Sequence, residues 1–134
     1  MNVPRKALFD TIVDFESYPE FLPEVVSAKA NGKGKKVRVD FELEVIKRFE
    51  YTLEFEVTVP TEVQWNLVKS NFFKTNSGRW LLQEGEKGVD VHYELEVAFG
   101  FLVPTWVTKK MTEVSLPAMF ERFEKRASEV GNGR

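Results

Sequence analysis

Two stretches of the chain alternate apolar and polar residues with a period of two. In residues 37–45 the apolar positions are Val37, Val39, Phe41, Leu43 and Val45, and in residues 49–59 they are Phe49, Tyr51, Leu53, Phe55, Val57 and Val59. Because successive strand side chains point to opposite faces, the pattern predicts two long antiparallel strands with one wet face. A turn near Lys47 would pair Phe41 with Phe55, which keeps both apolar faces on one side.

Three further segments continue the alternation. They are residues 63–70 (VQWNLVKS), residues 78–84 (GRWLLQE) and residues 89–99 (VDVHYELEVAF). The loop GEKG between the last two sets Arg79 across from Glu94 as a surface ion pair. The sequence therefore predicts a meander of at least five antiparallel strands.

Only the two ends of the chain look helical. Residues 4–14 place Pro4 in a first turn and an apolar stripe behind it, which predicts a short helix. The segment DFESYPEFLP, residues 14–23, contains two prolines and four large apolar side chains, so it is too broken for a long helix and too apolar for a solvated loop. Residues 104–129 carry two apolar stripes in different directions, with Pro117 between them. We expect one long helix with a kink or break around residues 113–116, and a straight helix that is apolar on two sides is the alternative.

A sheet with one apolar face and a long terminal helix predicts an α+β fold in which the curved sheet wraps the helix. The apolar faces are rich in aromatic residues, more so than a two-layer contact requires. These residues form either a solid core or the lining of a cavity. Aromatic stripes usually serve packing, so composition alone favours the solid core.

Length and charge narrow the function. The 134 residues predict a single domain spanning 1–134. The 19 basic and 21 acidic residues give no basic excess, which argues against direct nucleic-acid binding. No apolar run is long enough for a transmembrane segment and no targeting signal is visible, so we expect a cytoplasmic protein. With no cysteine and a single histidine, His92, on the polar side of its strand, we expect no metal site and no catalytic triad.

The outer face of the predicted sheet is acidic. The register above places Glu42 opposite Glu54 and Asp40 opposite Glu56, and like charges in such positions weaken strand pairing. One interpretation is a docking face for a basic protein partner. The other is ordinary solvation with Lys36 and Arg38 nearby.

Two blocks of sequence resemble a known family. Asp14, Tyr18, Pro19, Phe21 and Pro23 form an Asp-x-x-x-Tyr-Pro-x-Phe-x-Pro block, and Phe73, Lys74, Gly78 and Trp80 form a Phe-Lys…Gly-x-Trp block. With the segment 89–99 and its flanks, they make the chain similar to the START-like helix-grip superfamily (SRPBCC), in particular its polyketide cyclase and coenzyme Q-binding branch. The resemblance implies a helix-grip fold with two short N-terminal helices that close one side of an apolar cavity.

The resemblance covers three kinds of function: carriers of lipids and isoprenoid quinones, polyketide cyclases or dehydratases, and a ribosome-association toxin. An enzyme of this kind needs acids and bases that face the substrate, whereas every strand carboxylate here faces outward by parity. We therefore expect a carrier of an apolar small molecule (quinone, lipid or polyketide), with no catalytic residue, metal or cofactor. The predicted cavity residues are Tyr18, Phe21, Phe41, Tyr51, Phe55, Trp65, Trp80, Tyr93, Trp106 and Met111.

The start of the chain is short for this family. The family fold opens with an edge strand beside the last strand, whereas only three residues precede Pro4 here. A truncated first strand would leave the last strand, residues 89–99, with unpaired backbone groups. We expect self-association through this edge, either because the sequence lacks upstream residues or because two copies pair as a dimer.

Overall fold

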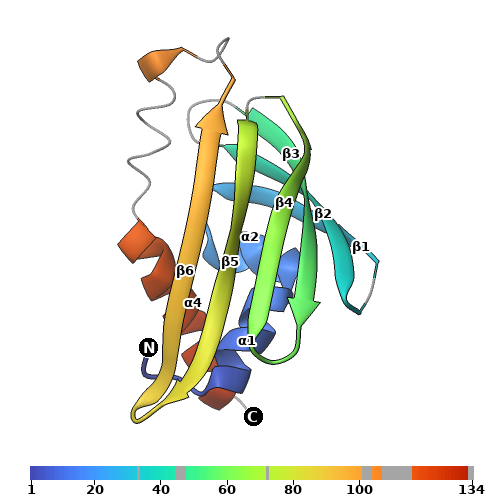
Figure 1. Cartoon of the computed structure of the whole chain (residues 1–134). Helices are drawn as coiled ribbons and strands as arrows, with labels where there is room; N and C mark the ends of the chain where they lie inside the picture. The colour runs from blue at the N-terminus through green and yellow to red at the C-terminus, as the bar shows by residue number, and fades with distance from the viewer. Residues whose placement is uncertain (33, 45–47, 72, 101–103, 107–115, 133–134) are drawn as a thin grey trace.

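A computed structural model describes residues 1–32, 34–44, 48–71, 73–100, 104–106 and 116–132. Six strands form one antiparallel sheet whose spatial order follows the chain. They are β1 (Val25–Asn31), β2 (Lys36–Glu44), β3 (Arg48–Thr58), β4 (Glu62–Ser70), β5 (Phe73–Gly85) and β6 (Gly88–Phe99). The sheet is curved, and the helices lie against its inner face (Figure 1). This architecture confirms the predicted helix-grip fold.

The N-terminal helices follow the prediction. Helix α1 (Arg5–Val13) begins directly after Pro4, and a 3₁₀ turn η1 (Phe15–Ser17) leads into the four-residue helix α2 (Tyr18–Phe21). A proline early in a helix loses no hydrogen bond, because the first N–H groups have no partner within the helix.

The C-terminal helix α4 (Leu116–Asn132) places Pro117 in its first turn. Before it, Thr105 and Trp106 are helical. The kink expected at residues 113–116 falls mostly outside the described residues. Within the part of the chain that the structure describes, no helix is long and apolar enough to cross a membrane.

Two features of the sheet were missed from the sequence. Strand β1 had not been predicted, because its apolar positions include the small residues Ala28 and Ala30 and give only a weak alternation. Strand β5 begins at Phe73, five residues before the predicted start at Gly78. Both errors concern strand ends and edges, where side-chain burial is incomplete.

The predicted register of β2 and β3 is wrong by four residues. Phe41 lies opposite Tyr51, and not opposite Phe55. An even shift keeps every apolar side chain on the same face, so the alternation alone cannot distinguish the two registers. Turn length and cross-strand pairs decide between them.

The observed register also changes the charge pattern of the outer face. Arg38 lies opposite Glu54, with 3.0 Å between Arg38 Nε and Glu54 Oε2. Asp40 faces Thr52, whose hydroxyl donates a hydrogen bond of 2.5 Å to Asp40 Oδ1. The expected contacts of Glu42 with Glu54 and of Asp40 with Glu56 are therefore wrong. Opposite charges in facing positions stabilise strand pairing and favour this register.

The predicted hairpin between β5 and β6 is confirmed. Arg79 lies opposite Glu94 and forms an ion pair with it, and Arg79 also contacts Glu62 at 3.2 Å. These hydrogen bonds to carboxylates raise the pKa of Arg79. The His92 side chain is 65% exposed, as its strand parity predicted.

The core lies between the inner face of the sheet and the helices. Its fully buried members include Leu8 and Ile12 from α1, Val39 from β2 and Ala127 from α4. A second, smaller apolar cluster surrounds Phe49. Leu43 and Tyr51 pack against both this cluster and the main core. The inner face is thus apolar along much of the length of β3.

Candidate ligand-binding site

Seven aromatic rings form a closed circuit of contacts on the inner face. Successive centroids lie 4.8 to 6.2 Å apart, within the range of favourable aromatic pairs. The seven residues, in order around the circuit, are Tyr18, Phe123, Trp80, Tyr93, Trp65, Phe55 and Phe41. We refer to them as the aromatic belt. It joins the short helix α2, the terminal helix α4 and the five strands from β2 to β6.

The segment 14–23 supplies the part of the belt that lies outside the sheet and the terminal helix. Tyr18 is buried, and its hydroxyl donates a hydrogen bond of 2.6 Å to the carbonyl oxygen of Ile12. Its ring meets Phe41 and Phe123, while Phe15 packs on Phe55 at 4.3 Å. The broken helix therefore buries its aromatic residues against the sheet and α4.

The three tyrosines of the chain lie close enough to influence one another's ionisation. Burial raises the pKa of Tyr18 well above its usual value, and Tyr93 and Tyr51 raise it further. Burial also raises the pKa of Tyr51, again with Tyr93 contributing, and raises the pKa of Tyr93 to about 12. All three phenols are neutral at physiological pH, and a neutral phenol can donate a hydrogen bond.

The Trp65 indole is held in place by a hydrogen bond and a glycine. Trp65 Nε1 donates a hydrogen bond of 3.0 Å to Oδ1 of the buried Asn76. Gly78 lies opposite Trp65 in the register, and a Cβ atom there would stand 2.6 Å from Trp65 Cζ2. The absence of a side chain at Gly78 lets the indole lie directly on strand β5.

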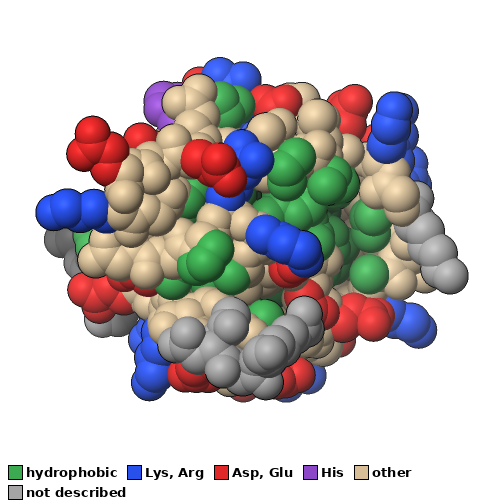
Figure 2. Space-filling view, turned by 90° about the horizontal axis from the view of Figure 1, so that it is seen from below, with side chains coloured by type: hydrophobic (Ala, Val, Ile, Leu, Met, Phe, Trp, Pro, Cys, Tyr) green, Lys and Arg blue, Asp and Glu red, His purple; other side chains and the backbone are tan. Residues whose placement is uncertain are grey.

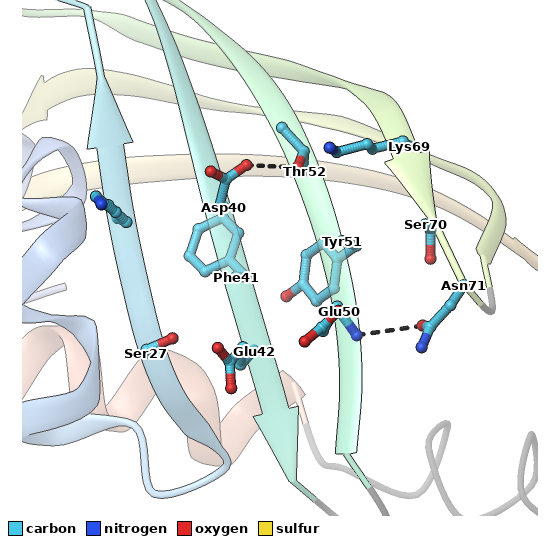
Figure 3. A pocket seen from close by; sticks show the side chains of 11 residues that line it. Ser27, Asp40, Phe41, Glu42, Glu50, Tyr51, Thr52, Lys69, Ser70 and Asn71 are labelled. Atoms are coloured by element: carbon cyan, nitrogen blue, oxygen red, sulfur yellow. Dashed lines mark hydrogen bonds between the residues drawn. The ribbon is translucent and has the colours of Figure 1, made fainter.

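The described residues line two concavities on the molecule. One, of about 560 Å³, lies on β1 to β4 and is lined mainly by polar residues such as Asp40, Glu50 and Lys69, together with Phe41 of the belt and Tyr51 (Figure 3). The other, of about 360 Å³, lies between the α1–η1 segment and the β1–β2 hairpin. Seen from below, the surface of the molecule has apolar side chains grouped between charged ones (Figure 2). Neither concavity includes the tryptophans of the aromatic belt.

The family model described as polyketide cyclase / dehydrase and lipid transport matches residues 1–124. The chain belongs to this family. No curated protein sequence matches the chain.

Solved structures share the fold at low sequence identity. TTHA0849 from Thermus thermophilus has a TM-score of 0.81 and 18% identity, over 97% of this chain and 93% of that one. The Zhui aromatase/cyclase from Streptomyces sp. R1128 has a TM-score of 0.80 and 11% identity, over 96% and 88% of the two chains. A STAR-related lipid transfer protein from Xanthomonas axonopodis has a TM-score of 0.76 and 14% identity, over 96% and 81%.

This member of the polyketide cyclase and lipid transport family brings most of the predicted cavity residues together. Six of them are in the belt, namely Tyr18, Phe41, Phe55, Trp65, Trp80 and Tyr93. Tyr51 stacks on Phe41 at 5.2 Å, and Phe21 meets Tyr18 edge to face at 5.7 Å. Trp106 is 60% exposed, and no aromatic contact of a described residue joins it to the belt. Met111 lies outside the described residues.

Phe123 was not among the predicted site residues. Its place on the same helical stripe as Ala127 was visible in the sequence, and both residues are buried against the sheet. Trp106 and Met111, nearer the start of the helical segment, were predicted instead. The signal that would have favoured Phe123 is the position of Pro117, because the segment after a proline begins a new, uninterrupted helix.

Helix α2 is tied to α4 by charged side chains as well as by rings. Arg126 Nη2 lies 2.7 Å from Glu20 Oε1, and its guanidinium lies 5.5 Å from the centroid of the Phe21 ring. Arg122 Nη1 lies 3.7 Å from Glu24 Oε1. The Arg126 contacts hold helix α2 against the terminal helix, and the Arg122 pair links that helix to the residue that directly precedes β1.

The Arg126→Gln variant is expected to lower the free energy of unfolding by about 1 kcal/mol, because it loses one ion pair and one cation–π contact. Urea unfolding measures this change. The deficit should shrink in high salt, which screens the ion pair. Lys125→Gln, an exposed neighbour on the same helix, is the matched control. Equal losses in the two variants would contradict a specific contact between α2 and α4.

Proposed function

We propose that this protein binds and carries an apolar small molecule with a carbonyl-bearing head group, an isoprenoid quinone or a related lipid, against the aromatic belt. The observation that carries the proposal is that Tyr51 and Tyr93, two half-buried phenols in an otherwise apolar wall, lie near enough for Tyr93 to raise the pKa of Tyr51. A neutral phenol donates a hydrogen bond, and a carbonyl oxygen accepts one. The rings and aliphatic side chains around them suit an apolar body.

The affinity would come mainly from the apolar tail. Each methylene transferred from water to an apolar site contributes roughly 0.8 kcal/mol. Three or four isoprene units therefore supply useful affinity even after the loss of ligand freedom is subtracted. The hydrogen bond to the head group adds orientation more than affinity.

The alternative within the family is catalysis on a polyketide. A general acid works best when its pKa lies near the working pH. Burial moves the pKa of Tyr93 to about 12 and raises the pKa of Tyr18 and Tyr51, away from that range. This direction favours a binding site over a catalytic one.

Native mass spectrometry of the protein purified from its own host tests the carrier function. A copurified quinone or lipid, released on denaturation, is the expected result. Turnover of a polyketide intermediate by the purified chain would favour the enzyme. Absence of both, together with no quenching of tryptophan fluorescence by a short-chain isoprenoid quinone, would overturn the proposal.

The Tyr93→Phe variant is expected to bind that quinone roughly five-fold more weakly, because it keeps the ring and loses one hydrogen-bond donor. Quenching of Trp65 and Trp80 fluorescence measures the dissociation constant. Wild-type affinity should be constant across neutral and mildly alkaline pH, because Tyr93 ionises only near its pKa of about 12.

Tyr18→Phe is the matched control for this prediction. Its hydroxyl is already bonded to the Ile12 carbonyl oxygen, so the change should reduce stability and leave quinone affinity nearly unchanged. Equal effects of the two changes on affinity would contradict a specific role for the Tyr93 hydroxyl.

A further inference from the structure

Three polar side chains are buried in the part of the chain that the structure describes, and none of them carries a charge. The Thr11 hydroxyl donates a hydrogen bond of 2.8 Å to the carbonyl oxygen of Ala7. The Thr52 hydroxyl donates to Asp40 on the outer face of the sheet. The third buried side chain is Asn76, which is 8% exposed and has both an acceptor and donors.

The Trp65 indole fixes the orientation of the Asn76 amide. An indole N–H can only donate, so the atom that lies 3.0 Å from Trp65 Nε1 is the amide oxygen of Asn76. The amide NH₂ group therefore points away from the indole nitrogen. Among the described residues, none accepts a hydrogen bond from Asn76 Nδ2. A largely buried donor without an acceptor costs free energy, so this NH₂ group calls for an explanation.

The NH₂ group borders space that another molecule can enter. Every fully buried side-chain nitrogen or oxygen of the described residues has a hydrogen-bond partner, so Asn76 Nδ2, which has none, is not fully enclosed. Asn76 lies on the inner face of β5, opposite the half-buried Val97 of β6. On its other side the described ladder between β4 and β5 ends at the pair of Trp65 and Gly78, before it reaches Asn76.

Trp65 links Asn76 to Tyr93, the phenol on which the carrier function depends. Its indole nitrogen bonds Asn76, and its ring centroid lies 5.7 Å from that of Tyr93. Two neutral donors therefore lie next to one indole. Because no charged side chain is buried among the described residues, a carboxylate placed here would lose its hydration without gaining a buried cation. These surroundings favour a neutral ligand.

We propose that Asn76 Nδ2 is a second hydrogen-bond donor to the ligand and that, together with Tyr93, it selects a neutral planar molecule with two carbonyl oxygens. The ring of such a molecule covers the Trp65 indole, and each donor binds one carbonyl oxygen. A quinone has these features, whereas a fatty-acid carboxylate has a single charged head group. This selectivity rests on the proposed carrier function, because it places the ligand against the aromatic belt.

Two probes separate recognition of the carbonyl groups from packing. One is a short-chain isoprenoid benzoquinone, and the other is benzene that carries the same isoprenoid tail. Isothermal titration calorimetry gives the dissociation constant of each. The wild type should prefer the quinone, and Asn76→Leu, which is similar in size, should reduce this preference roughly five-fold. Thr52→Val is the matched control, because it removes a buried hydroxyl on the outer face and should leave the preference unchanged.

Asn76→Asp separates the donor from the support of Trp65. The new carboxyl keeps an oxygen that accepts from the indole, and its charged form has no donor. At neutral pH this variant should bind the quinone at least roughly five-fold more weakly than the wild type. Acidification protonates the carboxyl and restores a donor, so affinity should recover as the pH falls. Burial raises the pKa of such a carboxyl, so recovery begins above its usual range. Wild-type affinity should stay constant over the same pH range.

The outcomes distinguish Asn76 from the carrier function itself. Equal weakening of both probes by Asn76→Leu would show that Asn76 only supports Trp65, and it would overturn the proposal while the carrier function stands. Wild-type affinity of Asn76→Asp for the quinone at neutral pH would overturn it in the same way. Equal affinity of the wild type for the two probes would exclude selection by any donor. If the wild type binds neither probe, the carrier function and the role of Asn76 both fail.

Discussion

Replacement of Tyr18 by alanine is expected to lower the free energy of unfolding by about 4 kcal/mol. The ring is buried and meets Phe41, Phe123, Phe15 and Phe21 at centroid distances of 5.5 to 6.0 Å. Its loss leaves a cavity and removes the hydrogen bond that Ile12 O accepts. Urea unfolding followed by tryptophan fluorescence measures the change. Against a typical total stability of about 5 to 15 kcal/mol, the variant loses a large share.

Tyr18→Phe separates the ring from the hydroxyl and is expected to lose only about 1 kcal/mol. A small loss in Tyr18→Ala would contradict the packed arrangement. It would favour the alternative in which segment 14–23 closes an open space, and the variant would then mainly raise the rate of ligand release. Phe21→Ala, at a half-buried position, should fall between the two Tyr18 variants in stability.

The alternation of apolar and polar residues predicted the faces of the strands but not how the strands align. Every second residue of β2 and β3 points inward in either register, and outer-face pairs such as Arg38–Glu54 and Asp40–Thr52 distinguish the observed one. A search of the sequence for complementary outer pairs would have favoured it. The alternation within one strand determines which side chains point inward, whereas the register depends on how two strands pair.

The site residues that lie on strands could be predicted from the sequence, because the alternation along a strand determines which side chains face inward. Phe41, Phe55, Trp65, Trp80 and Tyr93 all lie on the inner face as expected. The helical contribution was harder to predict, because the direction of a helix stripe depends on where the helix begins. Helix α4 begins at Leu116, and Phe123 lies on it and joins the belt. Trp106 lies before this helix and is exposed.

Gly78→Ala is expected to lower the free energy of unfolding by about 3 kcal/mol, because the position is overpacked on two sides. A Cβ atom at Gly78 would collide with the carbonyl oxygen of Glu94 on β6 and stand 2.6 Å from Trp65 Cζ2 on β4. The carbonyl belongs to the paired strand and cannot rotate away, so β5 and β6 must separate locally. Chemical denaturation measures the loss, and faster exchange of the β6 amides locates it.

Gly34→Ala is the matched control for this substitution. Nothing lies within 4 Å of a Cβ atom at Gly34, so the change introduces only the strain of its positive φ of 78°. That strain costs about 1 kcal/mol. Adding Trp65→Phe to Gly78→Ala should not restore stability, because the clash with the Glu94 carbonyl remains. Equal losses in Gly78→Ala and Gly34→Ala would show that the strands move apart easily and that Gly78 does not fix the Trp65 indole on β5.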